Sequence, residues 1–251
     1  MTYQRLVKMA RSKRRRTRKG SHSIATIKAL PRDILVDVIA IVASHSFIDL
    51  HNIKVCCKDF LDATDNSYVW RRVSLDKFPL IHWSPNHKAS QFLNRCREYE
   101  NIESLYREGL RAYFNYPHGN IDGLDILKAA CQKGHKEATY VYGMILLCSE
   151  DDALRKQGLE YMRFLRKSKC VVGSRKKVKH LLKCLWKNNG MLKRNQSSLC
   201  NSKSTCKGYK VKMGRWVLLD DDDDDDDAIS SCEYCRWNHE LEFFYQLFNI
   251  H

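Results

Sequence analysis

The 251-residue sequence contains little proline and glycine, with four prolines and eleven glycines. So few turn-forming residues disfavour an all-β or collagen-like chain and leave helices as the expected elements. No window of ~18 residues is free of charge, so the sequence predicts no transmembrane helix and no membrane partner. The amino terminus is charged and lacks the apolar stretch of a signal peptide. We therefore expect a protein of the nucleus or cytoplasm, whose eleven cysteines are reduced or bound to metal.

The sequence also lacks the residue patterns that mark a catalytic site. It contains no recognisable nucleophile–base constellation, phosphate-binding loop or catalytic carboxylate pair. We therefore predict that the protein is not an enzyme.

Two segments of the chain contain no acidic residue. Residues 1–20 carry nine Lys or Arg and no acid, and residues 161–194 carry twelve and no acid. We expect the tail, residues 1–28, to be disordered, because like charges repel one another and cannot form a core. Its basic run indicates nuclear import, with nucleic-acid contact or a merely solvated tail as alternatives. Residues 220–227 are all Asp and are expected to form an acidic loop without a calcium site, since calcium-loop ligands alternate with other residues.

The densest apolar segment runs from residue 30 to 75 and predicts three short helices. Leu30-Pro31 begins the first helix, because proline fixes φ where a helix start needs no N–H. Ser46, or alternatively Ser44, is placed to cap the second helix. The third helix passes through Phe60, and a turn then precedes Tyr68-Val69-Trp70. The apolar residues of the first helix recur at helical spacing and are Ile34, Leu35, Val38, Ile39 and Val42.

This order resembles an F-box, although a fragment of a larger helical core is the alternative. The matching motifs are Leu30-Pro31, the run Val55-Cys56-Cys57-Lys58-Asp59-Phe60 and the closing Tyr68-Val69-Trp70-Arg71. The second cysteine of the run departs from the family's Val-Cys-Lys, but a small residue still fits there. The resemblance implies that the segment binds a Skp-type adaptor and, through it, a cullin-based ubiquitin ligase. The residues expected to contact the adaptor, some of which must instead be intramolecular core, are Leu30, Pro31, Ile34, Leu35, Val38, Ile39 and Val55.

Residues 101–166 contain a pattern of paired helices. The motif Ala129-Ala130-x-x-x-Gly134-His135-x-x-Ala138 resembles a SEL-like repeat, a relative of the tetratricopeptide repeat. Glycine at 134 suits a helix C-cap in the left-handed region. One repeat and a fragment rarely stand alone, so the unit is expected to lean on the F-box or on the carboxyl-terminal region. It either offers a concave surface to a protein partner or is a plain helical hairpin.

A basic helix is expected within residues 167–198. We expect it to pack an apolar stripe on the repeat and to leave its lysines solvated, with binding of phosphates, membranes or an acidic partner helix as the alternative. The stripe consists of Val178, Leu181, Leu182, Leu185 and Trp186.

The carboxyl-terminal cysteines are the best metal candidate. Cys200-x5-Cys206 and Cys232-x2-Cys235 supply four thiols, the number that closes a tetrahedral zinc site, and His239 is an alternative ligand. A strand at residues 216–219 could hold the two pairs together. The alternative is four reduced cysteines without a metal. An aromatic final helix follows, and its expected core face is Leu241, Phe244, Tyr245 and Phe248.

The whole chain resembles plant F-box proteins that combine a SEL-like repeat with a Cys-rich end. It resembles F-box proteins with a MYND zinc finger more distantly, because it lacks the eight ligands of that finger. We expect a mainly α fold made of the tail 1–28, a three-helix F-box at 29–76, a helical repeat region at 77–198 and a Cys-rich module at 199–251.

The resemblance implies a substrate-recognition subunit of a Skp–cullin–F-box ubiquitin ligase, whose carboxyl-terminal half recruits a protein substrate. The alternative from another class is a nuclear nucleic-acid-binding or scaffold protein that uses the basic tail, the basic helix and the zinc module.

Overall fold

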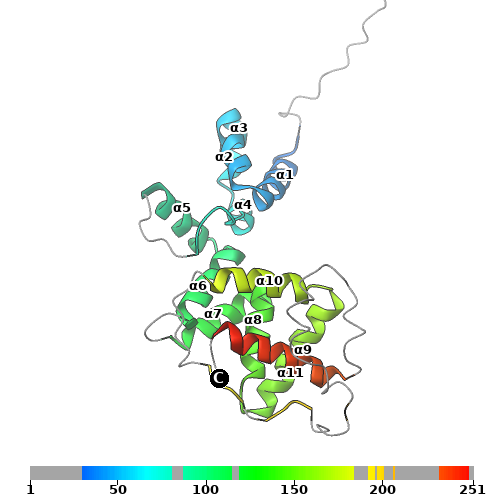
Figure 1. Cartoon of the computed structure of the whole chain (residues 1–251). Helices are drawn as coiled ribbons and strands as arrows, with labels where there is room; N and C mark the ends of the chain where they lie inside the picture. The colour runs from blue at the N-terminus through cyan, green and yellow to red at the C-terminus, as the bar shows by residue number, and fades with distance from the viewer. Residues whose placement is uncertain are drawn as a thin grey trace, which may run out of the picture.

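The computed structural model describes residues 30–80, 87–114, 119–183, 192–195, 197–200, 206 and 232–248. Within these ranges the regular structure is helical and contains no strand, which confirms the mainly α fold (Figure 1). None of the described helices has the length and apolar character needed to cross a membrane. The basic tail, the predicted strand at 216–219, the acidic run, Leu185 and Trp186 lie outside the described residues.

The amino-terminal helices surround one apolar core, which includes Ile39, Leu50 and Trp70. Pro31 precedes the first helix and Asp33 lies in its first turn, where the helix dipole favours an acid. The Ser46 hydroxyl accepts a hydrogen bond from the Asp49 N–H at 3.1 Å, so Ser46 and not Ser44 caps the second helix. The helices of this group are α1 (Arg32–His45), α2 (Phe47–Cys56), α3 (Lys58–Thr64), α4 (Ser67–Arg72) and α5 (His87–Glu98).

The structure adds α4 to the three helices expected between residues 30 and 75. The Asn66 side chain accepts a hydrogen bond from the Tyr68 N–H at 2.9 Å and so caps a helix where the sequence suggested only a turn. The helix is short, but it buries Val69 and Trp70 in the amino-terminal core.

The remaining helices enclose a second apolar core. They are α6 (Ile102–Phe114), α7 (Asp122–Gln132), α8 (Lys136–Leu147), α9 (Asp152–Lys167), α10 (Val171–Leu182) and α11 (Glu233–Leu247). Gly134 has a φ of +88°, which confirms the left-handed turn predicted between α7 and α8. The basic helix α10 buries Val178 and Leu182 against this core, as expected.

Helices α6 to α9 form two hairpins that repeat at the period of a tetratricopeptide repeat. Gly109 of α6 meets α7 so closely that an added Cβ would lie 2.8 Å from Leu127 Cγ. The same close approach recurs 34 residues later at Gly143 of α8, where an added Cβ would lie 3.2 Å from the Cβ of Tyr161 in α9. A period of about 34 residues is that of a tetratricopeptide repeat. Helix α10 begins a third unit that has no second helix within the described residues.

The carboxyl-terminal helix α11 packs across the face formed by α6, α8 and α10 (Figure 1). The Phe248 ring, directly after α11, stacks on Phe114 of α6 with the ring centroids 4.5 Å apart. The Phe244 ring meets Tyr140 of α8 edge-on at 6.4 Å. The apolar face predicted for the final helix is therefore core, and the repeat unit leans on the end of its own chain.

A buried ion pair fixes α11 on this face. The Arg175 guanidinium of α10 donates two hydrogen bonds to the Glu240 carboxylate, at 2.8 and 2.5 Å. The Tyr140 hydroxyl donates to the same carboxylate. The arginine and glutamate side chains are only 4% and 1% exposed, so the pair is shielded from water and the carboxylate depends on these donors.

Asn101 joins the two groups of helices. Its side-chain amide donates to the carbonyl oxygens of Trp70 and Val73, at 2.8 and 3.0 Å, and its oxygen accepts the Ser104 N–H at 3.0 Å. One buried residue thus caps α6 and fixes its start against α4.

Gly123→Ala tests the close approach of α6 and α7. The new methyl group would overlap the backbone nitrogen of Tyr113, and we expect the free energy of unfolding to fall by about 1–3 kcal/mol. Gly173→Ala in α10 is the matched control, because its methyl group meets no atom within 4 Å and should stabilise the helix by about 0.5–1 kcal/mol. Urea unfolding measures both changes, and equal effects would contradict the packing.

Arg175→Met tests the buried ion pair. The substitution leaves a buried carboxylate without its cation, and we expect a loss of about 3–5 kcal/mol in the free energy of unfolding. The double variant Arg175→Met/Glu240→Gln should lose less, because no charge is then left uncompensated and the glutamine still accepts from Tyr140. A double variant at least as unstable as the single one would argue against the pair. Chemical unfolding followed by circular dichroism makes the comparison.

Candidate functional site

Exposed apolar side chains form a row on α1 and α2. Ile34, Val38 and Ile41 follow one another along α1 at helical spacing and are between 47 and 56% exposed. On α2, Ile48 and Val55 are 52 and 73% exposed. Single exposed apolar residues are ordinary on a protein surface, whereas a row on two adjacent helices indicates an interaction site.

The structure divides the residues that the F-box resemblance assigned to adaptor contact. Leu35 and Ile39 are 7 and 0% exposed and lie in the amino-terminal core, so we remove both from the candidate set. Both belong to the same apolar core as Ala63 of α3 and Trp70 of α4. The outward residues are Leu30, Pro31, Ile34, Val38 and Val55.

Three exposed apolar residues were missed by the sequence reasoning. Ile41 lies seven residues after Ile34 and Ile48 lies seven residues before Val55, so helical spacing alone could have extended the row to both. Leu61 of α3 is also exposed and carries no such signal. The face made by Ile34, Val38, Ile41, Ile48 and Val55 is called the α1–α2 face below.

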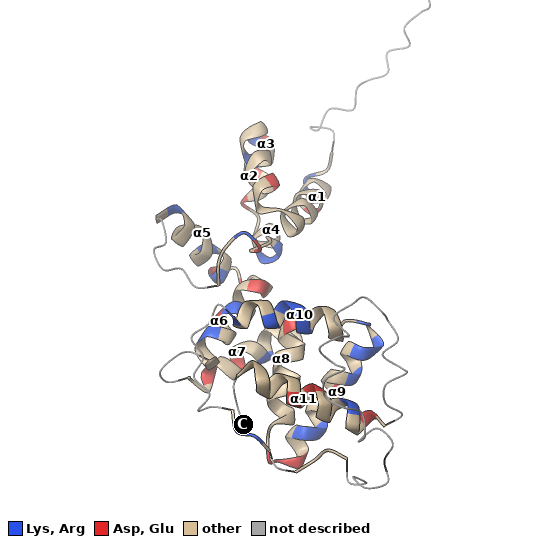
Figure 2. Cartoon of the chain, in the orientation of Figure 1, with Lys and Arg blue, Asp and Glu red and all other residues tan. Residues whose placement is uncertain are grey.

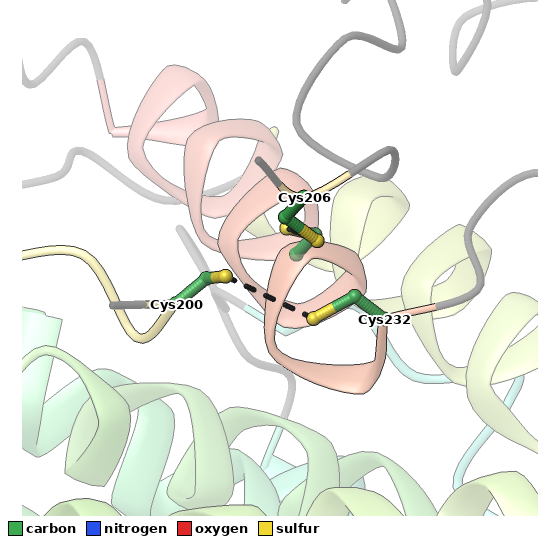
Figure 3. A group of neighbouring side chains, drawn as sticks. Cys200, Cys206 and Cys232 are labelled. Carbon is green, nitrogen blue, oxygen red and sulfur yellow. Dashed lines mark hydrogen bonds between the residues drawn. The ribbon is translucent and has the colours of Figure 1, made fainter. Parts of the chain in front are cut away.

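The second candidate is a cluster of four thiols at the start of α11 (Figure 3). The sulfur atoms of Cys200, Cys206, Cys232 and Cys235 all lie within 4.8 Å of one another. Two of the separations are 3.9 Å, between Cys232 and Cys200, and 3.4 Å, between Cys235 and Cys206. Tetrahedral ligands with Zn–S bonds of about 2.3 Å would be roughly 3.8 Å apart. The cluster therefore has the spacing to hold one metal ion, and His239 is not part of the close group.

Hydrogen bonds hold the two halves of the thiol cluster together. Cys232 is the N-cap of α11 and Cys235 lies in its first turn, whereas Cys200 and Cys206 lie outside the helices. The Asn238 side chain of α11 accepts the Leu199 N–H at 3.0 Å and donates to the Ser198 hydroxyl at 2.7 Å, directly before Cys200. Burial and the neighbouring thiols raise the pKa of the Cys235 thiol, so a cation is needed for several thiolates to coexist here.

His135 has a structural place, as the repeat turn suggested. Its Nδ1 accepts the Ala138 N–H at 3.1 Å and caps α8, while its Nε2 lies 2.7 Å from a Glu103 oxygen. Burial alone would raise the pKa of Glu103, but His135 and the Arg107 cation hold it below the usual range. These contacts tie α6 to the start of α8 and leave the imidazole no free nitrogen.

Comparisons with known proteins fit both halves of the chain. The family model of plant tetratricopeptide repeats matches residues 75–183. A putative F-box protein of Arabidopsis thaliana is 35% identical over 124 residues, which cover 49% of this chain and 40% of that protein. A second Arabidopsis thaliana F-box protein is 30% identical over 149 residues, which cover 58% of this chain and 86% of that protein. No solved structure matches.

The chain therefore belongs to the plant F-box proteins and carries a tetratricopeptide-like repeat region. This membership agrees with the resemblance seen at Leu30-Pro31, at Val55 to Phe60 and at Tyr68 to Arg71. The match covers less than half of the first relative's length.

Proposed function

We propose that this protein is the substrate-recognition subunit of a Skp–cullin–F-box ubiquitin ligase, acting in the nucleus or cytoplasm. The observation that carries the proposal is the exposed α1–α2 face in a chain of the F-box family. An adaptor that covers this face gains hydrophobic free energy from side chains that the fold leaves in water. The chain itself performs no chemistry and brings a protein substrate to the ligase.

The arrangement of the helices suits this role. The amino-terminal group of helices projects from the repeat region, with α1 to α3 farthest from it (Figure 1). An adaptor seated on α1 and α2 would therefore leave the surfaces of α6 to α10 accessible to a substrate. Asn101 couples the two groups, so a substrate bound to one would be held in a defined position relative to the other.

We propose that the thiol cluster binds one structural zinc ion through Cys200, Cys206, Cys232 and Cys235. Four sulfur ligands without an open position suit a structural rather than a catalytic site. The ion would join the start of α11 to the segment that contains residues 200 and 206. Its binding energy would then stabilise the closure of the repeat region by α11.

Val38→Asp tests adaptor binding. The charge falls on the exposed α1–α2 face, so we expect the fold to persist while capture of a plant Skp-type adaptor falls at least about tenfold, because a charge would be desolvated in the interface. Leu154→Asp is the matched control, because Leu154 is an exposed apolar residue of α9. Pull-down of the purified adaptor gives the comparison. Equal capture by Val38→Asp and the wild type would refute the proposed interface.

Metal analysis of the purified chain tests the zinc site. We expect close to one zinc ion per chain in the wild type and a clear loss in Cys235→Ser, because three thiolates bind zinc less tightly than four. Cys56→Ser is the control, since Cys56 is exposed on α2 and lies outside the cluster. Zinc near zero in the wild type and in Cys235→Ser would show that the cysteines are reduced and unliganded.

A further inference from the structure

The inner face of the repeat region is closed to a partner. Tetratricopeptide-type repeats use a concave surface for binding, but here α11 covers α6, α8 and α10. Its contact residues Phe244 and Phe248 are 0% exposed, and the Arg175–Glu240 ion pair is buried as well. A substrate of the proposed ligase subunit must therefore be recognised on another surface.

A cavity of about 240 Å³ opens at the junction of the two helix groups, between α5 and α6. Leu75, Pro79 and Leu80 line part of it, and the rest of the lining comes from α5 and α6 and is polar except for Leu93. Its volume is below the 300–1,000 Å³ of ordinary small-molecule pockets. It is thus large enough for one side chain of a bound peptide rather than for a complete ligand.

Three arginines line this cavity, namely Arg97 of α5 and Arg107 and Arg111 of α6 (Figure 2 shows these helices with their Lys and Arg in blue). Arg107 is held in place, because its Nε binds Glu103 at 2.5 Å and another nitrogen donates to the Phe78 carbonyl oxygen at 2.6 Å. Arg97 is 68% exposed and pairs with Glu108 at 2.7 Å. The cavity therefore has one fixed guanidinium and one that a ligand can reach.

Of the three arginines, Arg111 is the one whose guanidinium the protein itself engages least. Within the described part of the chain, the Arg111 guanidinium makes one long hydrogen bond, of 3.4 Å, to the Leu80 carbonyl oxygen. Among the described residues that line the cavity, Glu108 is the one acid, and Glu103 outside the lining pairs with Arg107. The cavity thus retains positive charge.

We propose that this cavity binds the phosphoryl group of a phosphorylated side chain in the protein substrate. Guanidinium groups bind phosphate oxygens through paired, charge-assisted hydrogen bonds, and Arg clusters are a recurring means of recognising phosphorylated peptides. A phosphoryl group near charge −2 complements the cavity better than a single carboxylate does. The leucines and Pro79 of the wall would hold an apolar neighbour of the modified residue. This inference rests on the proposed function only in that the bound peptide belongs to a ligase substrate.

The test is an array of matched peptide triplets that carry phosphoserine, glutamate or serine at one position between varied flanks. The array is probed with the purified full chain. We expect a set of phosphoserine peptides to bind at least about tenfold more tightly than their serine counterparts. Arg111→Gln should remove this preference. Arg71→Gln is the matched control and should keep it, because Arg71 is exposed at the end of α4 and does not line the cavity.

A second variant, Glu108→Gln, should change peptide binding in the opposite direction. It removes the carboxylate of the cavity lining and frees Arg97, so binding of the selected phosphoserine peptides should strengthen. Thermal unfolding of each variant shows whether the chain remains folded. Higher salt should weaken binding, because the contact is electrostatic.

Four results would overturn the proposal. They are the absence of any phosphoserine preference, equal binding of the glutamate peptides, a preference that survives Arg111→Gln, and Arg111-dependent binding of single-stranded DNA without peptide binding. Adaptor capture is measured on the same Arg111→Gln protein and should be unchanged. Failure of the wild type to capture the adaptor would instead contradict the ligase role and leave the peptide result standing by itself.

Discussion

The contact among Arg175, Glu240 and Tyr140 joins three helices that are far apart in the sequence. The Glu240 carboxylate of α11 is satisfied only where a donor from α10 and a donor from α8 converge. An apolar trio of the same shape could be equally stable, since burying charges carries a large desolvation penalty. The contact therefore selects one position for α11 among the many that its aromatic face could adopt.

This placement of α11 determines which surfaces can bind a partner. Two helical hairpins and a single further helix cannot bury their own apolar faces, and α11 supplies the missing layer. The thiol cluster lies at the start of α11 and would fix that end of the helix, as the ion pair fixes its middle. The two surfaces proposed to bind partners are the α1–α2 face and the cavity between α5 and α6. They belong to different parts of the chain, as expected of a protein that links an adaptor to a substrate.

Local features of the sequence predicted most of the helices and the cysteine group. Leu30-Pro31, the cap at Ser46 and the glycine at 134 act through their own backbone, so their effect can be deduced without the fold. The four cysteines were also found from spacing, because a tight Cys-x2-Cys pair restricts where two more thiols can come from. The proposed zinc ion itself stays a prediction.

Features that depend on long-range packing could not be deduced from the sequence. Helix α1 is apolar on both sides, so spacing alone could not tell the buried Ile39 from the exposed Val38. The pairing of Arg175 with Glu240 spans 65 residues, and nothing local marks either partner. The arginine cavity likewise depends on how α5 packs on α6, which no local pattern shows. The boundaries proposed for the tail, the F-box, the repeat region and the Cys-rich module stay predictions.

Hydrogen exchange of the full chain, measured by mass spectrometry with and without a plant Skp-type adaptor, tests the central claim most directly. The account predicts that amides of α11 exchange as slowly as those of α8 in both samples, because α11 belongs to the repeat core. It also predicts that the adaptor slows exchange in α1 and α2 alone. Rapid exchange throughout α11, or protection by the adaptor in α11 but not in residues 32–56, would contradict it.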